Sequence, residues 1–167
     1  MIWFTSDQHF FHKNILQYRS QFSSIEEMNQ GIIDRYNALV HKNDITYMLG
    51  DISFGKVEET NDVLSQLKGR KILILGNHDR IKMYKPNKLG GHFEAIYDYY
   101  ELNYNHKKII LCHYPLESWN KKNYGSIHLY GHVHQNNNLL SPIDNRYHIG
   151  VDTNDFKPVS LEQILNK

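Results

Sequence analysis

The sequence predicts a mixed α/β fold in which two β-sheets pack together. In the first half of the chain, short apolar runs alternate with stretches of helical periodicity, and that order favours a parallel sheet with right-handed crossovers. In the second half, several apolar runs follow one another, and the first two flank a turn typical of antiparallel pairing. Because the 167 residues contain no linker, repeat or low-complexity tract, we expect one domain over 1–167.

The first half is expected to begin with a strand at about residues 1–6 and a short helical stretch over 14–18. A long helix near 24–40 follows, and either Ser23 or Ser24 can cap it, because a glutamate three residues further on completes a capping box. Its apolar residues recur at helical spacing. The remaining elements of this half are a strand at 45–49, a helix near 58–68 and a strand at 71–75.

The second half is richer in strands. Residues 97–104 and 107–112 flank Asn105-His106, so we expect a β-hairpin there. The elements expected after the hairpin are strands at about 126–130 and 146–151 and a short terminal helix after Pro158-Val159-Ser160.

Net charge and cysteine content limit the class of protein. The formal net charge is +1, so no overall field attracts the chain to nucleic acid or to a membrane. The single cysteine, Cys112, has no partner for an internal disulfide, which fits a reducing compartment. The sequence shows neither a secretory leader nor a run of about 20 apolar residues. We therefore expect a cytoplasmic protein without a membrane partner.

Residues suited to a metal ion follow five of the apolar runs. Ligands of α/β proteins bind beyond the carboxyl ends of the strands, so these residues are expected to form one site. Carboxylate, imidazole and amide donors without thiolate suit Mn²⁺, Fe, Zn²⁺ or Ni²⁺. The seven candidates are Asp7 and His9, Asp51, Asn77, His113, and His132 and His134.

In order and content, these clusters resemble the calcineurin-like metallophosphoesterase superfamily. The resemblance runs from residue 7 to residue 134 through Asp-x-His, Gly-Asp, Gly-Asn-His-Asp, a histidine after the next strand, and Gly-His-x-His. The chain is most similar to the small single-domain prokaryotic and phage type, which it also resembles in three further segments. Those segments are Thr5–Phe10, His113–Leu116 and Gly150-Val151-Asp152.

The resemblance implies a four-layer β-sandwich of two mixed sheets flanked by helices. It implies two divalent metal ions, with Mn²⁺ the first expectation, which activate a bridging hydroxide for in-line attack on phosphorus. One ion would be held by Asp7, His9 and His134. The other would be held by Asn77, His113 and His132, with Asp51 bridging the two.

The resemblance also implies roles beyond the metal ligands. His78 would stabilise the transition state or protonate the leaving oxygen, and Asp79 would orient it. His12 and Arg80 are candidates for binding the substrate phosphate, although a helix cap or surface position explains His12 as well and a surface ion pair explains Arg80. Trp119, after His113, could stack a base or simply pack.

The function expected is a phosphodiesterase acting on a small nucleotide or a nucleic-acid end. A phosphomonoesterase with the same metal site is the alternative enzyme, and a non-catalytic protein-binding scaffold is the alternative from another class. No arginine follows Gly50-Asp51, where protein Ser/Thr phosphatases carry one, which disfavours phosphoprotein substrates. The sequence indicates no protein partner.

Overall fold

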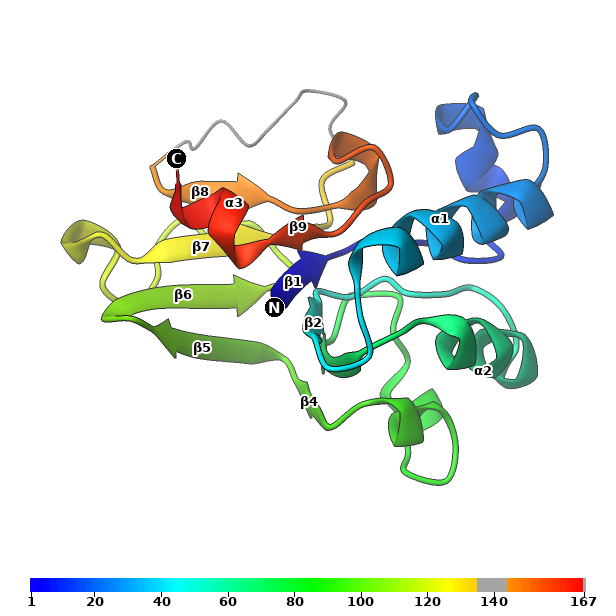
Figure 1. The fold of residues 1–167 in the computed structure, drawn as a ribbon, viewed down its shortest axis with the longest axis horizontal. Helices are drawn as coiled ribbons and strands as arrows, with labels where there is room; N and C mark the ends of the chain where they lie inside the picture. The colour runs from blue at the N-terminus through cyan, green and yellow to red at the C-terminus, as the bar shows by residue number, and fades with distance from the viewer. Residues whose placement is uncertain (135–143, 167) are drawn as a thin grey trace.

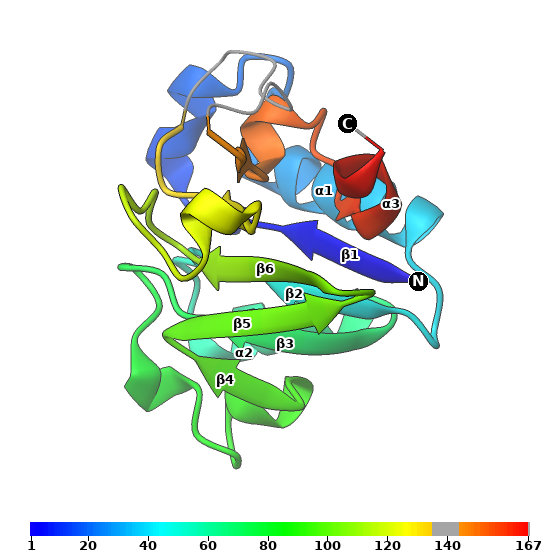
Figure 2. The same ribbon diagram turned by 90° about the vertical axis from the view of Figure 1, so that its left-hand side faces the viewer.

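Two β-sheets pack face to face in the computed structural model, which describes residues 1–134 and 144–166 (Figure 1). Within these residues, one sheet has five strands in the order β4-β3-β2-β1-β9, and the other has four in the order β5-β6-β7-β8. Each sheet combines parallel and antiparallel neighbours. Figure 2 shows β5 and β6 lying across β2 and β3. The prediction of two packed mixed sheets is confirmed.

The five-stranded sheet is built from parallel strands with one antiparallel strand at its edge. The parallel strands carry the expected runs of branched and aromatic residues. The antiparallel edge strand β9 pairs with β1. The strands are β1 (Ile2–Thr5), β2 (Ile45–Met48), β3 (Arg70–Ile74), β4 (Ala95–Tyr97) and β9 (Val159–Ser160).

The four-stranded sheet begins with the predicted hairpin. Asn105 and His106 both have positive φ, at 44° and 63°, which matches a tight turn between antiparallel strands. The last three strands run parallel to one another. The strands are β5 (Tyr99–Tyr104), β6 (Lys107–Cys112), β7 (Ile127–Tyr130) and β8 (Arg146–His148).

Helices α1 (Ile25–Leu39) and α2 (Val57–Gln66) lie on the side of the five-stranded sheet away from β5–β8 (Figure 1). Ser24 caps α1, since its hydroxyl accepts a hydrogen bond from the Glu27 N–H at 3.1 Å. The apolar faces of both helices join side chains of β1, β2 and β3 in one buried cluster. The shorter helical elements are η1 (Lys13–Tyr18), η2 (Ile81–Met83), η3 (Leu89–His92), η4 (Lys122–Tyr124), η5 (Val151–Thr153) and α3 (Leu161–Leu165).

A second apolar cluster fills the space between the sheets. It joins Phe4, Leu49 and Ile74 of the five-stranded sheet and its loops to Ile109 and Leu129 of the other sheet, all with 0% exposure. Burying a side chain of this size stabilises the fold by about 1.5–3 kcal/mol. This core holds the carboxyl ends of both sets of parallel strands at one edge of the sandwich.

Three features of the strands differ from the expectation. The strand expected over 97–104 is two strands, because the chain leaves the first sheet after β4 and enters the second sheet at β5. The strand expected over 146–151 ends at residue 148, and residues 151–153 form a 3₁₀ turn instead. Sequence reasoning missed β9 as a strand, since two residues show no periodicity.

Among the described residues, none of the helices is both long and apolar enough to span a lipid bilayer.

Replacing Ile109 with alanine should lower the free energy of unfolding by about 2–5 kcal/mol, because it leaves a cavity between the sheets. Ile109 has 0% exposure and pairs with Leu102 and Ile127 on the neighbouring strands. Chemical denaturation measures the change. Lys107→Ala, an exposed position on the same strand, is the control and should stay within about 0.5 kcal/mol of the wild type. If Ile109→Ala lowered the free energy of unfolding no more than Lys107→Ala does, the sheets would not be closely packed around Ile109.

Candidate metal centre

The segments that follow β1, β2, β3, β6 and β7 meet at one edge of the sandwich, and their backbones are joined to one another. The amide of Asp7 donates to the carbonyl of Gly50 at 3.0 Å, and the amide of His9 donates to that of Asp51 at 3.1 Å. The amide of Gly131 donates to the carbonyl of His113 at 2.9 Å. All seven predicted metal ligands therefore lie in one place, although the strands that carry them belong to two sheets.

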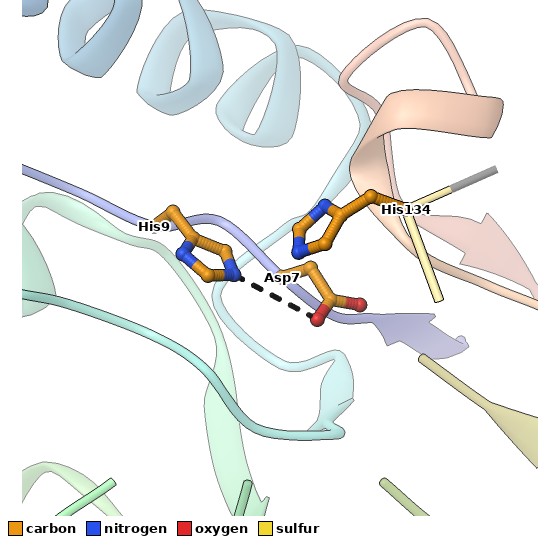
Figure 3. Close-up of side chains that lie close together, drawn as sticks. All are labelled: Asp7, His9 and His134. Atoms are coloured by element: carbon orange, nitrogen blue, oxygen red, sulfur yellow. Dashed lines mark ion pairs between the residues drawn. The ribbon is translucent and has the colours of Figure 1, made fainter. Parts of the chain in front are cut away.

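Asp7, His9 and His134 form the first group. A ligand atom of each lies within 4.8 Å of the others. Figure 3 shows both imidazole rings beside the Asp7 carboxylate, with His9 Nε2 3.9 Å from Asp7 Oδ1. The two ring centroids are 4.7 Å apart. This spacing is too long for direct hydrogen bonds between the side chains and leaves room between them.

Asn77, His113 and His132 form the second group. The Asn77 side-chain oxygen lies 3.0 Å from His113 Nε2 and 2.9 Å from His132 Nδ1. Asp51 lies between the two groups, because its Oδ2 is 3.6 Å from His9 Nε2 and also 3.6 Å from His113 Nε2. The arrangement places one carboxylate within reach of both groups.

The donor set fits divalent metal ions. The His9 ring is 3% exposed, and neither of its nitrogens has a hydrogen-bond partner among the described residues. Burying polar atoms without partners is unfavourable, so a cation that accepts the lone pair of one His9 nitrogen would remove part of a cost that the fold otherwise bears. Carboxylate, imidazole and amide oxygen donors without thiolate suit Mn²⁺, Fe, Zn²⁺ and Ni²⁺.

Backbone strain is concentrated at the same residues. Asp7, His9, Asp51 and His132 have φ of 60°, 52°, 55° and 69°, in the left-handed region. Such conformations are unfavourable outside glycine, and they persist where the surrounding structure fixes them, commonly at functional sites. Close packing also explains a glycine of the motif: a Cβ on Gly131 would lie 2.3 Å from Asp7 Oδ2.

A buried ion pair supports the first group. The Arg19 guanidinium, 0% exposed, donates to both Asp152 oxygens at 2.7 and 2.9 Å. It also donates to the backbone carbonyls of Asp7 and Gln8, each at 2.7 Å. His134 Nδ1 lies 2.9 Å from Asp152 Oδ2. Asp152 therefore fixes the His134 ring through Nδ1 and leaves Nε2 for the site.

Burial and neighbouring charges shift the pKa values of Asp152, His134 and Asp7. Burial opposes ionisation of Asp152, but hydrogen bonds from His134 and Arg19 outweigh it and hold the pKa of Asp152 well below its ordinary value. The hydrogen bond to Asp152 raises the pKa of His134 above its ordinary value, against the effect of burial. Burial likewise opposes ionisation of Asp7, yet the nearby His9 ring and the neighbouring histidines lower the Asp7 pKa. Both carboxylates are therefore ionised at neutral pH; that of Asp152 is engaged by Arg19 and His134, and that of Asp7 is available to a cation.

Asp79 has a different role from the predicted one. Its oxygens accept hydrogen bonds from the backbone amides of Asp51 at 2.7 Å, Ile52 at 3.2 Å and Gly76 at 2.9 Å. The Tyr84 hydroxyl donates to it as well, at 2.9 Å. Burial raises the pKa of Asp79, and the hydrogen bonds that it accepts oppose that effect. Asp79 thus joins the loop after β2 to the loop after β3, and its acceptor sites are used there rather than on the His78 ring.

His78, His12 and Arg80 lie around the mouth of the site. The His78 side chain is 46% exposed, and its Nε2 lies 3.9 Å from Asp51 Oδ2. His12 stacks on the Phe54 ring with centroids 4.0 Å apart. Arg80 is exposed and lines a hollow together with His78. The exposed His78 ring can therefore meet a substrate. His12 lies against Phe54, and its Nδ1 is buried without a hydrogen-bond partner among the described residues, so its contact with a substrate phosphate stays a prediction.

Sequence reasoning missed Arg19 and Asp152 as parts of the site. In the sequence, Asp152 belongs to the segment Gly150-Val151-Asp152, which gives it no role of its own. Arg19 lies in a polar stretch next to η1 and carries no motif, so nothing in the sequence marked it. For Trp119 the sequence left two interpretations open, stacking of a base and packing. The structure favours packing, because Trp119 is buried and its Nε1 donates a hydrogen bond to Ser126 Oγ at 2.9 Å.

The family model of the calcineurin-like phosphoesterases matches residues 1–149. The chain belongs to this family. This calcineurin-like phosphoesterase contains a candidate metal centre of Asp and His residues, and its family acts on phosphoesters. Family membership and fold together support a hydrolase of phosphoesters.

The relatives of this phosphoesterase include proteins from an archaeon, a phage and a bacterium. It is 34% identical over 171 residues to an uncharacterized protein of Methanocaldococcus jannaschii, covering 98% of this chain and 89% of the relative. It is 29% identical over 177 residues to the gene 66 protein of Mycobacterium phage L5, covering 90% and 86%. The crystal structure of a protein of unknown function from Aquifex aeolicus has a TM-score of 0.80 and 29% identity, covering 99% of this chain and 98% of that one.

Asp152→Asn should lower the metal affinity of the site by about 10–100-fold, because an amide fixes the tautomer of a ligating histidine less well and lacks the negative charge. Titration of Mn²⁺ against a chelating indicator measures the change. Asp155→Asn is the matched control, since Asp155 is 70% exposed and pairs with Lys157 on the surface. Thermal unfolding without metal checks the fold of both variants. Unchanged affinity in a folded Asp152→Asn protein would contradict the role of Asp152.

Proposed function

We propose that this phosphoesterase is a two-metal phosphodiesterase that acts on a small nucleotide or a nucleic-acid end. The observation that carries the proposal is the position of Asp51, with its Oδ2 3.6 Å from a histidine of each group. Asp7, His9 and His134 would hold one ion, and Asn77, His113 and His132 the other, with Asp51 shared. Mn²⁺ is the first candidate, with Fe, Zn²⁺ and Ni²⁺ as alternatives.

A bound pair of divalent ions supplies an activated water and charge compensation for the phosphate. The protein itself contributes orientation and proton transfer. Asp51 also accepts a hydrogen bond from the His78 backbone amide at 2.9 Å, which fixes the position of His78 relative to the two groups. The exposed His78 ring would then protonate the oxygen of the departing group.

The charges around the mouth favour a diester. A monoester dianion carries one more negative charge than a diester and calls for more basic donors. Of the residues that line the hollow beside His78, Arg80 is the one with a permanent positive charge. A phosphomonoesterase would use the same metal site, so the two activities differ in these surroundings. A non-catalytic scaffold is disfavoured because all seven candidate ligands and His78 are retained.

The proposal includes a cytoplasmic location, supported by a chain whose one cysteine, Cys112, is a buried free thiol. Cell fractionation with an antibody against the protein tests it.

A side-by-side assay of esters tests the reaction. With Mn²⁺, bis(nitrophenyl) phosphate or a 2′,3′-cyclic nucleotide should show a higher kcat/KM than the matching monoester, because the diester needs less positive charge. Both activities should disappear after chelation and return with Mn²⁺. A clear monoester advantage would overturn the phosphodiesterase assignment. Absence of all metal-dependent hydrolysis in a protein that binds metal would favour the scaffold.

His78→Gln should lower turnover by about 10²–10⁴ on esters with poor leaving groups, the usual contribution of a general acid. The loss should shrink for nitrophenyl esters, whose leaving group needs little protonation. Metal content, measured by elemental analysis, should not change. His41→Gln is the control, because the His41 side chain is 78% exposed and lies outside the site. An equal loss on both kinds of ester would indicate electrostatic stabilisation instead, and loss of metal would place His78 among the ligands.

A further inference from the structure

A hollow of about 280 Å³ opens beside the candidate metal centre. It lies between the loop after β2 and the loop after β3 and shares Asn77 and His78 with the site. Its size is just below the usual range for small-molecule pockets, so it suits one ring system rather than an extended chain. The lining residues are Ser53, Phe54, Gly55, Asn77, His78, Arg80 and Met83.

Phe54 gives this hollow an aromatic wall. The ring is 40% exposed, so a large apolar side chain is in contact with water at the edge of the site. It stacks on His12 at 4.0 Å with an interplanar angle of 11°, and its centroid lies 4.7 Å from that of His78. Covering the exposed part of such a ring with another apolar surface is favourable.

The turn that carries Phe54 is fixed in place. The Phe54 amide donates to the carbonyl of Phe10 at 2.8 Å. Ser53 Oγ accepts a hydrogen bond from the Gly55 amide at 3.0 Å and lies 2.7 Å from the Thr60 hydroxyl. Because the ring is already held by these contacts, little conformational freedom is lost when a ligand stacks on it.

The rest of the lining selects the class of ligand. None of its residues is a carboxylate, which disfavours a cationic ligand, and Arg80 offers several N–H donors to carbonyl or phosphate oxygens. The Ser53 hydroxyl is already engaged by the Gly55 amide and the Thr60 hydroxyl of α2, so it offers little to a polyol. An aromatic face, a thioether at Met83 and a guanidinium together suit a planar heteroaromatic ring with acceptor atoms.

We propose that this hollow binds the nucleobase of the group that departs on the His78 side, with the base against Phe54 and Arg80 on its acceptor atoms. The inference rests on the proposed function, because that function decides which group of the substrate lies on the His78 side of the phosphate. It makes Phe54 a residue that determines specificity and makes nucleotides, rather than sugar or alkyl phosphates, the substrate class.

Equilibrium binding tests the inference separately from catalysis. Isothermal titration of the Mn²⁺-loaded protein with adenosine 5′-monophosphate, uridine 5′-monophosphate and ribose 5-phosphate compares ligands that share a phosphate and differ in the base. We expect the nucleotides to bind more tightly than ribose 5-phosphate. Phe54→Leu, which removes the aromatic face and keeps an apolar side chain, should weaken nucleotide binding about five- to tenfold and leave ribose 5-phosphate unchanged.

Tyr124→Leu is the control, because Tyr124 is 88% exposed and lies outside the hollow. Thermal unfolding shows whether each variant is folded. If Phe54→Leu is not folded, Phe54→Tyr takes its place; it keeps the aromatic face and should bind nucleotides as the wild type does. Equal binding of all three ligands, or equal weakening of all three by Phe54→Leu, would overturn the inference. If binding depended on the base but no ester were hydrolysed, the hollow would still be a nucleobase site, and the proposed function would be refuted instead.

Discussion

The guanidinium of Arg19 is fully buried and joins segments that are far apart in the chain. It holds the carbonyls of Asp7 and Gln8 and both oxygens of Asp152, which in turn holds His134. A buried charge is strongly unfavourable unless it is paired and hydrogen-bonded, so this arginine requires all of these partners at once. The requirement fixes the Asp7 loop relative to the segment that carries His134.

Asp79 has a comparable role on the other side of the site. Its buried carboxylate accepts hydrogen bonds from the amides of Asp51 and Gly76, and so joins two loops that carry candidate ligands. The strained backbone at Asp7, His9 and Asp51 is tolerated because these contacts leave the loops few alternatives. The site is therefore positioned by buried polar contacts behind it as well as by the apolar core between the sheets.

The surroundings of the candidate metal centre divide into a buried rear and an exposed front. At the rear lie the buried candidate ligands Asp7, His9, Asp51 and His113 and the charges that support them. At the front lie His78, the exposed edge of Phe54 and the guanidinium of Arg80. These front residues differ in chemistry from the ligands behind them, so the choice of substrate is expected to depend on them.

The sequence by itself determined the order of elements and the seven candidate ligands, because both are local patterns. Apolar runs predict strands wherever they lie, and polar residues at the ends of parallel strands must meet at one edge. The sequence could not show that residues 95–104 divide between two sheets, or that Val159–Ser160 forms the edge strand β9, since pairing partners decide both.

Only the tertiary structure decided the roles of Arg19, Asp152 and Asp79. Arg19 and Asp152 are 133 positions apart, and no periodicity or motif connects them. The family resemblance implies that Asp79 orients the His78 ring, but the folded chain directs the Asp79 oxygens to the amides of Asp51 and Gly76. The physical reason is that partners of buried charges are chosen by distance in space, whereas the sequence records only distance along the chain.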